Sequence, residues 1–168
     1  MNKLANVKSG EIYAIPLFLE NELDNKSFAK HRFDEYSNEF VFCRIIEDLG
    51  GGGILIEVFS KKGNLKTELN DIIIYPRLFA PITISGVAIY KKRWTRIYLQ
   101  DNYDKEKDSK FSEITLITGA GKDLAMWKGG KQLGCINELQ AQNFERWIVW
   151  RGSQLEKRII KSLGNIEC

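Results

Sequence analysis

Short apolar runs rich in β-branched and aromatic residues recur along most of the chain, a pattern typical of a β-rich fold. Residues 11–18 are apolar at almost every position, so we expect a strand that is buried on both faces or lies at a barrel edge. Pro16 should end it, because proline has no N–H for the ladder. Residues 40–46 and 54–59 flank four glycines and predict a hairpin. Shorter runs predict a meander of further strands at 72–75, 82–85, 87–90, 94–98, 114–118 and 126–128.

The apolar spacing becomes helical near the end of the chain, from about residue 137, first around 139–144 and then in the last segment. Ser153 and Glu156 have the spacing of a capping box, and Gly164 is a natural C-terminal stop. The intervening helix carries four apolar side chains on one face, each worth about 1.5–3 kcal/mol when buried. We therefore expect it to cover an open face of the sheet through Leu155, Ile159, Ile160 and Leu163.

Two polar stretches interrupt this pattern. Residues 20–38 have no clean period and predict a long excursion with a short helix around 27–32, while residues 101–110 predict a charged loop. A chain of 168 residues has the length of one domain. We predict a single domain over residues 1–168 in the α+β class and mainly β: a twisted antiparallel sheet or partly open barrel covered by the C-terminal helix.

Composition narrows the class of protein. An apolar share of 43% and a charged share of 28% are those of a folded chain, and a net charge of +3 lacks the strong positive field typical of nucleic-acid binding. Residues 1–8 hold no signal-peptide core, and no apolar run reaches the roughly 18 residues of a membrane span. Cys43, Cys135 and Cys168 are too few and too widely spaced for a disulfide framework. We expect free thiols, no membrane association and a cytoplasmic location.

Candidate chemistry is sparse. Residues 119–123 read Gly-Ala-Gly-Lys-Asp, but a phosphate-binding loop needs a glycine where Leu116 stands and a hydroxyl residue where Asp123 stands. His31 and Cys43 could form a base and thiol nucleophile only if they met in space and the pKa of the thiol were lowered, and the sequence favours neither condition. One histidine and scattered cysteines form no metal-ligand cluster. We therefore predict a protein that is not an enzyme, with no cofactor and no metal.

Several segments, taken in order, resemble the bacterial immunity protein 26 family. Residues 7–17 hold a Gly-acidic-apolar-aromatic strand ending in Ile-Pro-Leu, and residues 40–46 combine aromatic residues with an arginine. The similarity continues through 56–59, 82–86, the tryptophan-centred run 93–97 and the part from 127 to 160. The excursion at 20–38 departs from the compact form expected of the family. The resemblance implies an intracellular protein that is made beside a polymorphic or contact-dependent toxin and neutralises it by binding.

Contact residues are expected in exposed loops, which carry function more often than cores. Our candidates for toxin binding are Asp34, Glu35, Tyr36, Asp101 and Tyr103. One alternative is a small β-barrel nucleic-acid-binding or regulatory module, in which aromatic residues stack on bases and neighbouring cations meet phosphates. Another, ranked last, is an enzyme that uses His31 or Cys43. The residues of the nucleic-acid alternative would be Lys91, Lys92, Arg93, Trp94, Arg96 and Tyr98.

Overall fold

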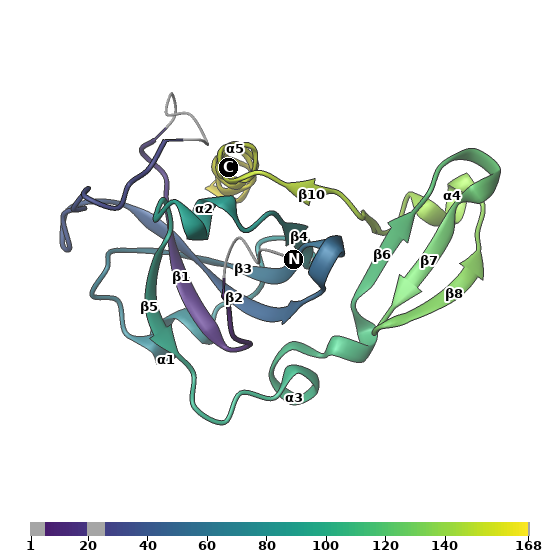
Figure 1. Cartoon of the computed structure of the whole chain (residues 1–168), viewed down its shortest axis with the longest axis horizontal. Helices are drawn as coiled ribbons and strands as arrows, with labels where there is room; N and C mark the ends of the chain where they lie inside the picture. The colour runs from purple at the N-terminus through teal and green to yellow at the C-terminus, as the bar shows by residue number, and fades with distance from the viewer. Residues whose placement is uncertain (1–5, 20–25, 168) are drawn as a thin grey trace.

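The computed structural model describes residues 6–19 and 26–167, and most of their regular structure is β (Figure 1). A six-stranded sheet has the order β10-β4-β3-β2-β1-β5, a four-stranded sheet the order β8-β7-β6-β9, and neither closes into a barrel. The strands are β1 (Glu11–Pro16), β2 (Phe40–Asp48), β3 (Ile54–Gly63), β4 (Ile82–Ile84), β5 (Thr95–Leu99), β6 (Thr115–Thr118), β7 (Ala125–Lys128), β8 (Lys131–Cys135), β9 (Glu145–Arg146) and β10 (Val149–Trp150). The helices are α1 (Leu69–Ile73), α2 (Val87–Tyr90), α3 (Lys105–Ser109), α4 (Glu138–Ala141) and α5 (Gly152–Glu167).

The long hairpin of β2 and β3 is the centre of the larger sheet. The two strands pair antiparallel from Phe40 opposite Gly63 to Asp48 opposite Ile54, and the glycine turn joins them as predicted. A Cβ at Gly52 would lie 2.8 Å from the Trp147 ring, so only glycine lets that ring pack against the turn. All pairings in this sheet are antiparallel except the one between β4 and β10.

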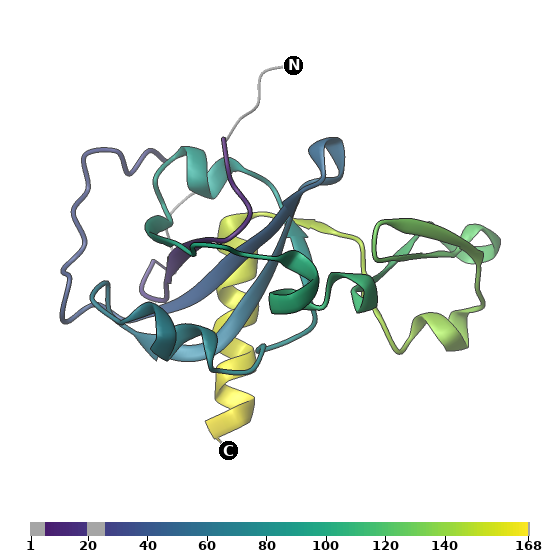
Figure 2. The same ribbon diagram turned by 90° about the horizontal axis from the view of Figure 1, so that it is seen from below.

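Helix α5 covers one face of the larger sheet, and Figure 2 shows it crossing behind the strands. Leu155, Ile159 and Leu163 pack against side chains of β1 to β4, which confirms the predicted cover. The prediction of a capping box at Ser153 and Glu156 is wrong, because the helix begins at Gly152 and the Glu156 carboxylate binds Arg93. The other errors concern Gly164, which lies inside the helix, and Ile160, which is exposed.

The opposite face of the sheet has its own apolar layer. Ile12, Ala14 and three phenylalanines of β2 and β3 pack there against α1, with partly buried Phe33 and Leu65 at the margin. Both faces of β1 are thus buried, as the uninterrupted apolar run predicts.

The smaller sheet lies to one side, at the right of Figure 1. Its strands β6 and β7 correspond to the predicted runs 114–118 and 126–128, while β8 forms its outer edge. Leu116 and Trp127 of this sheet share one buried cluster with Ile46 and Leu55 of the larger sheet. An apolar layer therefore joins the two sheets.

Several short elements differ from the predictions. Two apolar runs expected as strands, 72–75 and 87–90, fall in or beside helices α1 and α2, because periodicity over four residues does not separate a strand from a helical turn. The loop 101–110 contains α3, where Asp104 accepts hydrogen bonds from the N–H groups of Glu106 and Lys107. No helix forms within 27–32, and the predicted C-terminal helical part is interrupted by β9 and β10. Cys168 and residues 20–25 of the predicted excursion lie outside the described residues.

Candidate interaction surface

The loop before β2 carries three of the predicted contact residues. Asp34 Oδ1 accepts hydrogen bonds from the N–H groups of Tyr36 and Ser37, both at 2.9 Å, and these bonds lower the pKa of Asp34. The Glu35 carboxylate lies 3.1 Å from Lys66 Nζ. Tyr36 is 72% exposed. Asp34 therefore shapes a turn that presents the Tyr36 ring to solvent.

The other two predicted contacts follow β5. Asp101 is exposed, whereas Tyr103 is partly buried and its ring lies 5.1 Å from the Arg44 guanidinium. Its hydroxyl is 2.6 Å from Ser109 Oγ, and burial raises the pKa of Tyr103 to about 12. Gln100 N–H donates to the Gly10 carbonyl, which holds this segment beside the start of β1. Tyr103 is therefore tied into the fold, and Asp101 is the more accessible of the two.

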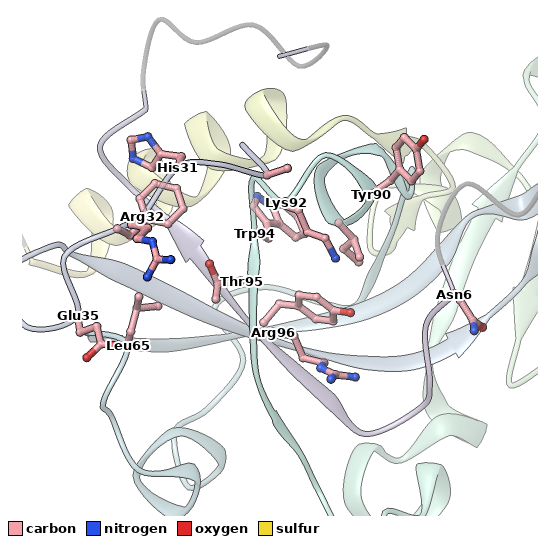
Figure 3. A pocket seen from close by; sticks show the side chains of 14 residues that line it. Asn6, His31, Arg32, Glu35, Leu65, Tyr90, Lys92, Trp94, Thr95 and Arg96 are labelled. Atoms are coloured by element: carbon pink, nitrogen blue, oxygen red, sulfur yellow. The ribbon is translucent and has the colours of Figure 1, made fainter. Parts of the chain in front are cut away.

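A cavity of about 1110 Å³ lies beside the first two residues of β5, Thr95 and Arg96 (Figure 3), and we call it the β5 groove. Its walls come from the loop before β2, from α2 and from β5 itself, with Asn6 at one end. Glu35 is the one predicted contact that lines it; the other four do not. The polar and aromatic side chains that matter most for its chemistry are His31, Arg32, Tyr90, Lys92 and Arg96.

Positive charge dominates this groove. Arg32 and Lys92 are exposed, and neither forms an ion pair with any residue in the described part of the chain. The Arg96 side chain is 60% exposed and lies 3.4 Å from the buried Glu11 carboxylate. Glu35 is already paired with Lys66. The groove is thus suited to a ligand with negative charge.

The turn after α2 places two neighbouring basic residues differently: Lys92 is exposed, whereas Arg93 is buried. Lys92 has a left-handed backbone with φ of 61°, and its N–H donates to the Ile89 carbonyl. This geometry leaves Lys92 exposed and turns Arg93 into the interior, where the Arg93 side chain is 1% exposed. Of the basic residues named for the nucleic-acid alternative, Arg93 therefore does not lie on the surface.

Arg93 is held by a buried carboxylate. Its Nε and Nη2 lie 2.7 and 2.8 Å from the two Glu156 oxygens, and Trp94 Nε1 donates to the same carboxylate at 3.0 Å. Arg93 Nη2 also donates to the Leu19 carbonyl, at 3.2 Å. These contacts link α5 to the base of the β5 groove. Trp94 is 1% exposed, so it cannot stack on a base as the nucleic-acid alternative requires.

A second buried ionic cluster lies on the opposite side of the sheet, and sequence reasoning missed it. The Arg44 Nε and Nη2 atoms lie 3.2 and 3.1 Å from one oxygen of Glu57, and Arg77 Nε lies 3.1 Å from the other. Ser109 also donates to Glu57. Both carboxylate oxygens are engaged, so Glu57 is a structural anchor for the segment that follows β5 and not a free base.

The thiol and imidazole of the enzyme alternative have different surroundings. Cys43 is fully buried in the cluster beneath α5, and burial raises the pKa of its thiol, the opposite of what a nucleophile needs. His31 is exposed and its ring lies against Phe28 and Phe33.

Among residues 6–19 and 26–167, no group of three or more metal-ligating side chains gathers, and no helix is long and apolar enough to cross a bilayer.

Comparison with known protein families identifies the family of this chain. The model of a family described as Immunity protein 26 matches residues 8–124. The matched segment spans β1 to β6 and includes every lining residue of the β5 groove except Asn6, whereas α5 lies beyond it. No curated protein and no solved structure matches the chain.

Proposed function

The chain belongs to the immunity protein 26 family, and from this premise we propose that it binds a cognate bacterial toxin and neutralises it by occlusion. The family match over residues 8–124 is the observation that carries the proposal. The toxin would be of the polymorphic or contact-dependent kind. By binding it, this chain would protect the cell that produces the toxin and the sister cells. We propose a cytoplasmic location for this complex.

Occlusion needs a firm surface and slow dissociation, and no bond has to be made or broken. A standard protein interface buries about 800 Å² on each partner. A low rate of dissociation keeps the toxin bound and therefore inactive. The larger sheet supports such a role, because both faces of β1 and β2 are packed. We also propose that the two sheets act as a single domain, since Ile46 and Leu55 share a core with Leu116.

We propose that neutralisation involves no catalysis by this chain. The thiol of Cys43 is buried with a raised pKa, and Glu57 is engaged by two arginines. Asp34, Glu35, Tyr36, Asp101 and Tyr103 remain proposed toxin contacts. Of these, Tyr36 and Asp101 are the exposed side chains without a described ion pair or side-chain hydrogen bond.

The test is co-expression with the toxin domain encoded by the adjacent reading frame. The chain should restore growth of cells that produce the toxin and should co-purify with it. Expression with an unrelated toxin of the same activity is the control, and growth should not be restored there. A correctly folded chain that neither protects nor associates would contradict the proposal.

A further inference from the structure

We infer that the free edge of β5 is the docking site for an extended, acidic segment of the toxin, which adds to the larger sheet as an outer strand. This inference rests on the proposed function and names the chemistry that the toxin presents. Three features of the structure carry it: the unpaired edge of the sheet, the β5 groove at the start of this strand, and the charge of that groove.

The first feature is the position of β5. It is the last strand of the six-stranded sheet and pairs on one side only, with β1, from Glu11 opposite Leu99 to Ala14 opposite Thr95. The register of this pairing shifts between Ile12 and Tyr13, at Ile97 of β5. On either side of that shift, alternate N–H and C=O groups of the edge strand point away from β1, and no other strand in the described part of the chain pairs with them. Such an edge is a template for an additional strand.

The second feature is how the β5 groove runs. Tyr13 and Ile89, which line it, belong to the apolar cluster on the α5 side of the sheet. Phe33 and Leu65, which also line it, belong to the cluster on the opposite side. The groove therefore passes around the edge of the sheet at β5, where an added strand would lie with side chains directed to both faces.

The third feature is charge. Arg32, Lys92 and Arg96 stand along the groove from different elements, as Figure 3 shows, and Glu35 is already paired with Lys66. An added strand with Asp or Glu at alternate positions would place carboxylates beside these cations. An extended protein segment fits better than nucleic acid, because Trp94 and Arg93 are buried and offer neither stacking surface nor free charge.

The test compares three forms of the full chain against the purified toxin domain from the adjacent reading frame. Arg32→Glu/Lys92→Glu reverses two groove charges and should lower the affinity about tenfold or more, mainly through the association rate. Lys128→Glu/Lys131→Glu makes the same charge change on exposed positions of the smaller sheet and should bind as the unmodified chain does. Circular dichroism and melting temperature establish that each variant is folded.

Hydrogen exchange supplies a second readout, specific to strand addition. In the complex, backbone amides within residues 95–99 should exchange at least about tenfold more slowly than in the free chain. The reason is that the amides on the outer edge gain hydrogen-bond acceptors from the added strand. Failure of the unmodified chain to bind the toxin would remove the proposed function itself. Toxin binding with unchanged exchange at 95–99, or equal binding by the groove variant, would overturn the docking inference alone. Oligonucleotide binding lost in that variant, with toxin binding kept, would also overturn it.

Discussion

Glu156→Gln tests how firmly the C-terminal helix is tied to the sheet. The Glu156 side chain is 6% exposed, and its carboxylate makes paired contacts with the Arg93 guanidinium at 2.7 and 2.8 Å. Glutamine keeps the size of the side chain but removes its charge. The variant therefore removes the Glu156 charge from the buried guanidinium of Arg93 while changing the packing around Leu155 and Ile159 very little.

The expected loss follows from burial. Removing one partner of a buried ion pair costs about 3–5 kcal/mol, because the remaining charge stays desolvated. With a urea m-value of about 2 kcal/mol/M, the unfolding midpoint should fall by about 1.5–2.5 M. Urea titration followed by tryptophan fluorescence measures this midpoint, because Trp94 is buried in the folded protein and becomes exposed on unfolding.

Two further variants make the measurement specific. Glu167→Gln removes an exposed carboxylate from the same helix, one that contacts Lys62, and should cost less than about 1 kcal/mol. Replacing both partners, as Arg93→Met/Glu156→Leu, should recover much of the loss, because neither charge of this buried pair remains. A loss below about 1 kcal/mol for Glu156→Gln would refute the reasoning that Arg93 is desolvated.

Three other predictions concern the core and one turn. Cys43 should resist iodoacetamide in the folded protein while exposed Cys135 reacts, because burial raises the pKa of the Cys43 thiol. Peptide mass spectrometry measures labelling at both sites, and labelling of Cys43 without unfolding would contradict this prediction. Gly10→Ala should cost about 1–3 kcal/mol in urea unfolding, since Gly10 has φ of 90° and a Cβ there would meet Tyr103 at 2.7 Å. Gly51→Ala, in open space, is its control and should be near neutral. Arg44→Met should cost about 3 kcal/mol or more in the same assay by leaving Glu57 short of one arginine, and a neutral result would mean that this cluster is not desolvated.

Sequence reasoning succeeded where one element carries a long, repeated pattern. The continuous apolar run of β1, the hairpin of β2 and β3 across the glycines, and the helical spacing of Leu155, Ile159 and Leu163 each identify an element and its buried side. The ordered resemblance in these same segments led to the family. Short apolar runs carry less information, which is why α1 and α2 were expected as strands.

The candidate interaction surface was harder to predict from the sequence, because its residues come from distant segments of the chain. Arg93 and Glu156 are 63 positions apart, and each looks like an ordinary surface charge until the fold brings them together. The β5 groove likewise joins the loop at 31–35 to residues 89–96. Of the predicted contacts only Glu35 lines it, since a loop's polarity does not reveal which sheet edge lies beside it.

The most direct test of neutralisation by occlusion is a titration of the toxin's activity with the folded chain. Activity should fall linearly to near zero at one equivalent, and the toxin should regain activity when the complex is dissociated by denaturation and refolded alone. Loss of activity at far below one equivalent, or a toxin recovered in chemically altered form, would contradict the account.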